Sequence, residues 1–86
     1  MGYSSRYRKA AEKYLDSQTA AVRERIMDAV DALPGGDVRK LQGRDGYRLT
    51  IGGFRILFNY TSEKTDGGES VIDIVLIGPR GDVYKK

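Results

Sequence analysis

The stretch Tyr47–Phe58, with the sequence YRLTIGGFRILF, decides the expected fold of this chain. Two runs of alternating apolar and polar residues meet at Gly52-Gly53, which is typical of a β-hairpin with a two-residue loop. Such a loop fixes the register of the two strands. The expected pairs are Ile51 with Phe54, Thr50 with Arg55, Leu49 with Ile56, and Arg48 with Leu57.

This register divides the hairpin into an apolar face and a basic face, because side chains alternate along a strand. The face expected to pack on the core carries Tyr47, Leu49, Ile51, Phe54, Ile56 and Phe58. Arg48, Thr50 and Arg55 share the other face, with the two arginines in diagonal positions. Like charges on neighbouring strands repel each other unless an anion lies between them, so the hairpin predicts an anionic ligand.

The composition limits the chemistry that the chain can perform. Its 86 residues predict one domain over 1–86. The absence of cysteine and histidine excludes disulfides, a thiolate nucleophile, an imidazole base and a Cys/His zinc site. No carboxylate cluster indicates a metal, and no cofactor is expected. No apolar run reaches the roughly 18 residues of a membrane span, and no signal peptide is evident, which predicts a cytoplasmic protein without a membrane partner.

The positive charge is concentrated around the hairpin. The chain carries a net charge of +3, which alone says little about partners. Residues 38–60 contain one acidic residue, Asp45, and the basic residues Arg39, Lys40, Arg44, Arg48 and Arg55. This distribution favours phosphate or an acidic protein as the partner.

Two helices are expected before the hairpin. The first follows a cap at Ser4-Ser5 and has an apolar stripe from Tyr7 to Leu15, so only residues 1–3 precede it and a strand there is nearly absent. The second follows a cap within Ser17–Thr19, has its stripe from Val22 to Leu33, and ends at Pro34-Gly35-Gly36. The short connection predicts an antiparallel helix pair. Its tyrosines are expected to pack at the core rather than to stack on nucleic acid.

The remaining segments complete a small sheet. Residues 37–46 and 62–69 are polar and glycine-bearing, which predicts loops, and 83–84 predicts a last short strand. Val71–Ile77 is apolar at both alternating sets apart from Asp73, which predicts a strand in the middle of a sheet, with Asp73 as a structural carboxylate. The expected fold is α+β, with the helix pair packed on one face of a small, mostly antiparallel sheet. The face of Arg48, Thr50 and Arg55 would stay open as a basic trough, bordered by Arg80 and Tyr84.

Several segments together resemble the RelE/ParE toxin superfamily across nearly the whole chain. They are the helix pair, KLQGRDGYRL over 40–49, GFRILF over 53–58, an apolar strand, and GPRGDVY over 78–84. Each segment is weak alone, and their order is what is specific. The resemblance implies a toxin of a bacterial toxin–antitoxin pair. In one branch such toxins are ribosome-dependent mRNA endonucleases, and in the other they bind DNA gyrase.

The resemblance also implies roles for individual residues in RNA cleavage by attack of the 2′-OH on the adjacent phosphate. Arg55 would grip the scissile phosphate, Arg80 would stabilise charge, and Arg48 stands where the nucleases carry a basic residue of the active site. Tyr84 would stack on a base or orient the 2′-OH. Bidentate contact between guanidinium and phosphate suits this task. The positions expected to bind RNA phosphate are Lys40, Arg44 and Thr50.

One departure from the pattern concerns the general base. Thr50 stands where some of the nucleases have a second lysine, others use His or Glu, and an arginine is a poor base. Arg48, Tyr84 and ribosomal RNA stay open as the proton acceptor. The expectation is therefore a metal-independent endoribonuclease of the RelE type, with ribosome, mRNA and a separately encoded antitoxin as partners. The alternative is a ParE-like toxin that binds gyrase, and a third possibility is an RNA-binding module without activity.

Overall fold

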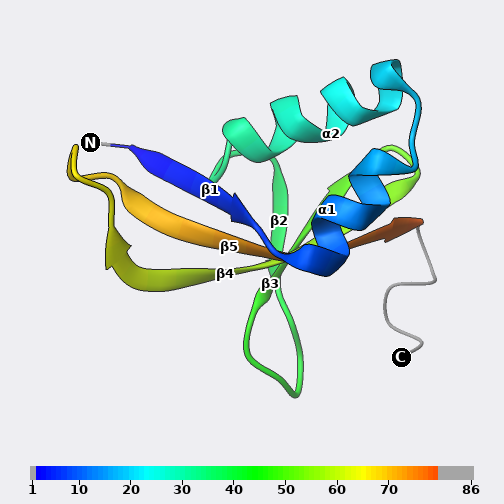
Figure 1. The fold of residues 1–86 in the computed structure, drawn as a ribbon. Coiled ribbons are helices and arrows are strands. Elements are labelled where there is room, and N and C mark those ends of the chain that lie inside the picture. The colour runs from blue at the N-terminus through cyan, green and yellow to red at the C-terminus, as the bar shows by residue number, and fades with distance from the viewer. Residues whose placement is uncertain (1, 80–86) are drawn as a thin grey trace.

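Two helices pack on one side of a five-stranded, mostly antiparallel sheet in the computed structural model, which describes residues 2–79 (Figure 1). The predicted α+β fold is confirmed. The elements in chain order are β1 (Tyr3–Tyr7), α1 (Lys9–Asp16), α2 (Ala20–Asp31), β2 (Asp37–Lys40), β3 (Tyr47–Ile51), β4 (Phe54–Lys64) and β5 (Ser70–Pro79). The strand order is β1-β5-β4-β3-β2, and only β1 and β5 are parallel.

The hairpin has the register that the sequence predicts. Ile51 faces Phe54, and the pairs continue to Arg48 with Leu57. Gly52 has a φ of +50°, a backbone conformation that side-chain-bearing residues rarely adopt, which explains the glycine in the turn. Leu49, Ile56 and Phe58 are buried beneath the helices, as expected for the apolar face.

The core lies between the helices and the sheet. It joins Ala11 and Leu15 of α1 to Ile26 and Val30 of α2, and both pairs have the i, i+4 spacing of a single helix face. The strands contribute aliphatic residues and Phe58 from the facing side. The predicted cap before the second helix is confirmed, since the Thr19 hydroxyl accepts a hydrogen bond from the Val22 amide at 3.3 Å.

Three segments differ from the sequence predictions. Residues 62–64, expected in a loop over 62–69, continue strand β4 to Lys64. Residues 3–7 form a strand, not the start of a helix, because Tyr3, Ser5 and Tyr7 alternate with Ser4 and Arg6 and pair in parallel with β5. The cap predicted at Ser4-Ser5 is therefore wrong, and α1 begins after Arg8. Residues 37–40, expected in a loop, form the edge strand β2, where Val38 pairs with Leu49 and packs against the core.

Strand β5 lies in the middle of the sheet, as predicted, between β1 and β4. A β-bulge explains why apolar residues occur at both the odd and the even positions of β5. Phe58 pairs with Ile74 and Leu57 with Leu76, so Val75 is left over and the alternation shifts by one residue. Ile72 and Ile74 before the bulge, and Ile77 after it, thereby all reach the core. The short strand predicted at 83–84 lies outside the described residues.

Candidate anion-binding site

Three adjacent strands bring arginines to the sheet face opposite the helices. Arg39 of β2 pairs with Arg48 of β3, and Arg55 of β4 pairs with Thr50, two residues further along β3. Paired residues project to the same face, so Arg39, Arg48 and Arg55 share it, with Arg48 and Arg55 in diagonal positions. The sequence predicted Arg48 and Arg55 on one face, and the structure adds Arg39.

Arg39 was missed because residues 37–46 were predicted to form a loop. Only four residues belong to β2, and a single β-branched residue, Val38, marks it as a strand. Once β2 is placed beside β3, the position of Arg39 follows from its pairing with Arg48. Its guanidinium lies 3.7 Å from the Asp37 carboxylate, and both side chains are more than half exposed, so this pair is weak.

A hollow of about 370 Å³ lies beside these strands. It is lined by Arg39, Lys40, Leu41, Gln42, Arg44 and Arg48, so four cationic residues contribute to its wall. The described residues that line it include no carboxylate. A phosphate group entering this hollow would meet guanidinium donors that suit its tetrahedral oxygens.

The loop over 41–46, which Figure 1 shows projecting away from the helices, carries Arg44 to the hollow. The loop is closed by a hydrogen bond from the Leu41 amide to the Gly46 carbonyl. Gly46 has a φ of +121°, and a Cβ at this position would lie 2.8 Å from the Asn59 side-chain oxygen. Glycine is therefore required where this loop rejoins the sheet.

The basic face is less open than the sequence suggested. Arg48, Thr50 and Arg55 are half-buried, and the Nε atoms of both arginines are buried. Leu57, which pairs with Arg48 on this face, is also buried. Partial burial limits the freedom of the arginine side chains, which reduces the entropy lost when they bind a ligand.

The predicted site residues are therefore only partly brought together. Arg48, Arg44 and Lys40 line the hollow, whereas Arg55 and Thr50 lie on the same sheet face but outside its lining. Lys40 pairs with Tyr47, so its position on β2 faces the helix side even though the side chain reaches the rim of the hollow. Arg80 and Tyr84, predicted to complete the site, lie outside the described residues.

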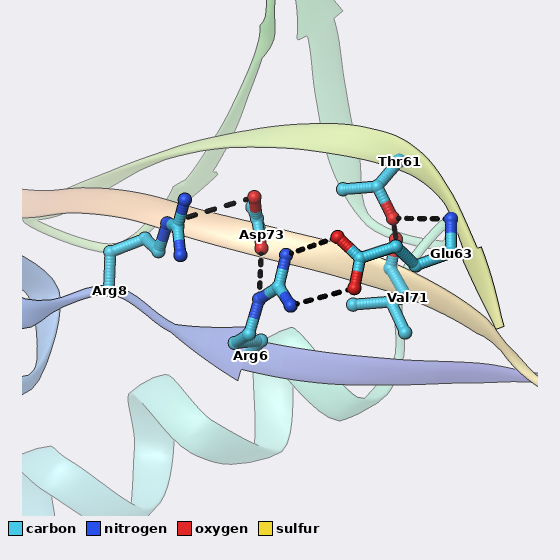
Figure 2. Close-up of polar contacts among 6 residues, drawn as sticks. All are labelled: Arg6, Arg8, Thr61, Glu63, Val71 and Asp73. Atoms are coloured by element: carbon cyan, nitrogen blue, oxygen red, sulfur yellow. Dashed lines mark hydrogen bonds and ion pairs between the residues drawn. The ribbon is translucent and has the colours of Figure 1, made fainter. Parts of the chain in front are cut away.

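A second polar cluster lies on the same face at the other edge of the sheet (Figure 2). Arg6 of β1 donates hydrogen bonds to Asp73 at 2.7 Å and to both carboxylate oxygens of Glu63 at 2.9 and 3.0 Å. Arg8 lies 3.7 Å from Asp73. The hydrogen bonds from Arg6 lower the pKa of both carboxyl groups. The predicted structural role of Asp73 is confirmed.

Within residues 2–79, no helix is long and apolar enough to cross a membrane. The same residues contain no group of three Asp or Glu side chains arranged to hold a metal ion. Burial, with a smaller contribution from Asp31, raises the pKa of Tyr7 to about 12. Tyr7 and Tyr14 both pack against the core, as the sequence predicted.

No protein-family model matches this chain, and no curated protein matches it.

Proposed function

We propose that this chain is a RelE-like toxin of the RelE/ParE superfamily, a cytoplasmic endoribonuclease that cleaves mRNA on the ribosome. The observation that supports the proposal is the set of arginines from β2, β3 and β4 on one sheet face, beside a hollow lined by four cationic residues. The order of elements and the motif succession in the sequence supply the link to the family.

In this proposal the arginines stabilise the charge on the phosphate and do not accept the proton of the 2′-OH. Cleavage by the RNA's own 2′-OH passes through a phosphorane with two negative charges, and guanidinium groups held in place stabilise that charge. Arg55 and Arg48 would hold the scissile phosphate from neighbouring strands. Lys40 and Arg44 would hold flanking phosphates at the hollow, with Thr50 as a hydrogen-bonding neighbour. Arg80 and Tyr84 would complete the site.

The partners follow from the same chemistry. A basic surface on a small protein has to be neutralised when the toxin is inactive, and a separately encoded antitoxin with an extended, acidic segment would do so. The ribosome and its mRNA would be the polyanionic target, approached by electrostatic attraction.

The test is translation in a cell-free extract, followed by primer extension along the message. We expect wild type to produce new 5′ ends of downstream fragments at ribosome-bound codons, and Arg55→Ala to lose them. Lys13→Ala is the matched control, since it removes one positive charge from an exposed position on α1, on the far side of the sheet. Thermal unfolding of each variant shows whether the half-buried Arg55 is also needed for folding.

Two results would contradict the proposal. Intact message with trapped gyrase–DNA complexes would favour the ParE-like alternative. Cleavage that persists in folded Arg55→Ala and Arg48→Ala variants would show that this face does not act on the phosphate.

A further inference from the structure

Three tyrosines form a connected row on the helix side of the sheet, at the end that the helices leave uncovered. Figure 1 shows β1, β5 and β4 extending at the left beyond the end of α2. The row consists of Tyr3, Tyr60 and Tyr47. The ring centroid of Tyr60 lies 5.9 Å from that of Tyr3 and 5.1 Å from that of Tyr47. Phe58 lies buried against Tyr47 and Tyr60. We call these three residues the tyrosine row.

Two residues of the tyrosine row, Tyr3 and Tyr60, face solvent, whereas Tyr47 is half-buried against the core. Tyr47 pairs with the buried Phe58, and Tyr60 pairs with the buried Ile72, which places both on the helix side. Tyr3 and Tyr60 are nevertheless 44% and 40% exposed, which makes them two of the most exposed large apolar side chains among the described residues. Rings fixed by their neighbours lose little entropy on binding, so they suit flat, aromatic ligands.

A lysine lies at each end of the tyrosine row. Lys40 lines a hollow of about 680 Å³ together with Tyr47 and Tyr60, and the side chains of Asn59 and Ser62 supply hydrogen-bonding groups there. The Thr61 hydroxyl also lines it, but it donates a hydrogen bond to the Val71 carbonyl and accepts one from the Glu63 amide. Lys64 lines a second hollow, of about 270 Å³, together with Tyr3. The larger hollow also contains two carboxylates, Asp45 and Asp73, and Asp73 accepts a hydrogen bond from Arg6.

We propose that the tyrosine row binds single-stranded RNA, with bases stacked on the exposed rings and phosphates held by Lys40 and Lys64. Base stacking on aromatic side chains next to cations is the usual way in which proteins hold single strands. A partner helix would instead favour aliphatic contacts. The other exposed large apolar residues described are Met27 on α2 and Val75 on the bulge of β5, and neither lines the two hollows.

The position of Lys40 connects this surface with the anion-binding site. Lys40 lines both the cation-rich hollow and the hollow of the tyrosine row. A single RNA strand could therefore pass from the arginine face around β2 onto the tyrosine row. The choice of RNA as the ligand rests on the proposed function, whereas the stacking itself depends only on the tyrosine row.

The experiment uses Tyr60→Trp, because the chain has no tryptophan and the new indole is then the only one. Oligo(U) RNA of about ten nucleotides is titrated into the full chain at low salt while indole fluorescence is followed. We expect saturable quenching. Adding Tyr3→Ala should weaken binding about tenfold, and Lys40→Ala should weaken it as well. Met27→Ala and Lys13→Ala are the matched controls, and neither should change the affinity.

Two further measurements separate stacking from folding and from charge. In the otherwise wild-type chain, Tyr60→Phe should keep the RNA affinity measured by fluorescence anisotropy, whereas Tyr60→Ala should lower it, with thermal unfolding recorded for both. An abasic ribose-phosphate strand of the same length should bind without quenching the indole of the Tyr60→Trp variant.

Three results would overturn the proposal. They are an unquenched indole at saturating RNA, equal quenching by the abasic strand, and self-association of the wild type that Tyr60→Ala abolishes. The last would identify the tyrosine row as a contact between two copies. Cleavage that persists while the row fails to bind would overturn this inference alone. Quenching without cleavage would count against the proposed function alone.

Discussion

The two edges of the sheet place arginines on the same face in opposite electrostatic settings. At the β1 edge, Arg6 lies between Asp73 and Glu63, with three hydrogen bonds of 2.7 to 3.0 Å (Figure 2). At the β2 edge, Arg39 has an exposed carboxylate 3.7 Å away and pairs across the strands with another cation, Arg48. At the β1 edge the arginine is paired with carboxylates, whereas at the β2 edge two arginines lie side by side.

This difference separates structural arginines from candidate ligand-binding ones. Hydrogen bonds between ions fix geometry and satisfy the charge inside the protein, so Arg6 helps to hold the parallel strand β1 to β5 and to the end of β4. Cations that line a hollow without a described carboxylate raise the local positive potential and favour an anion from outside. The same side chain therefore has different tasks at the two edges, and mutations can distinguish them.

The largest effect is expected at the β2 edge, on the binding of an anionic ligand. Arg39→Ala and Arg48→Ala should each weaken the binding of a short single-stranded RNA by about tenfold at low salt, and should each reduce the slope of log K against log salt by about one. Each variant would remove one of the proposed phosphate contacts. Fluorescence anisotropy at several salt concentrations measures both quantities.

Lys13→Ala is the control for this measurement, because it changes the net charge by the same amount from the helix side. If it weakens RNA binding as much as Arg39→Ala does, the effect comes from net charge and the hollow is not the site.

A smaller effect is expected at the β1 edge, on stability. Asp73→Ala should lower the free energy of unfolding by about 1–2 kcal/mol, because its half-buried carboxylate accepts a charged hydrogen bond from Arg6. Asp37→Ala, at the exposed pair with Arg39, should change it by less than about 0.5 kcal/mol. Urea unfolding of the two variants beside wild type measures the difference. Equal losses would mean that the two edges do not differ as described.

The sequence predicted the parts of the fold that depend on short-range patterns. The hairpin register follows from two glycines between alternating runs, and the cap at Thr19 follows from a hydroxyl before an apolar stripe. The strand β1 was missed because Tyr7 fits the helical period of the residues after it, while its pairing partner β5 lies 67 residues further along the chain. Parallel pairing at that separation leaves no local signal.

For the candidate site too, the sequence placed only the residues whose positions depend on a short-range pattern. Arg48 and Arg55 were placed together from the hairpin alone, because a two-residue loop leaves one register. Arg39 and the tyrosine row could not be found in this way. Their positions depend on an edge strand of four residues and on the length by which β4 extends past β3, and these are set by the packing of the whole sheet.

The smallest and most specific effect is the pH dependence of the β1 edge. Hydrogen bonds from Arg6 lower the pKa values of Asp73 and Glu63 in the folded chain. A carboxyl group whose pKa is lower in the folded than in the unfolded chain stabilises the folded chain at pH values above its unfolded pKa, which is about 4 for these groups. This stabilisation is lost as the pH falls through the pKa of the folded chain. The raised pKa of Arg6 has no effect in this range, because arginine stays charged in both states.

The stability difference between wild type and Asp73→Asn should therefore be constant from pH 7 to about pH 5, persist at pH 4, and vanish only at lower pH. Thermal unfolding of this variant and wild type across this range measures it. A difference that stays the same from pH 7 down to about pH 3 would show that Asp73 is not held by Arg6, because a carboxyl group with equal folded and unfolded pKa values makes no pH-dependent contribution to stability. The β1 edge would then resemble the β2 edge, and the distinction between the two arginine groups would fail.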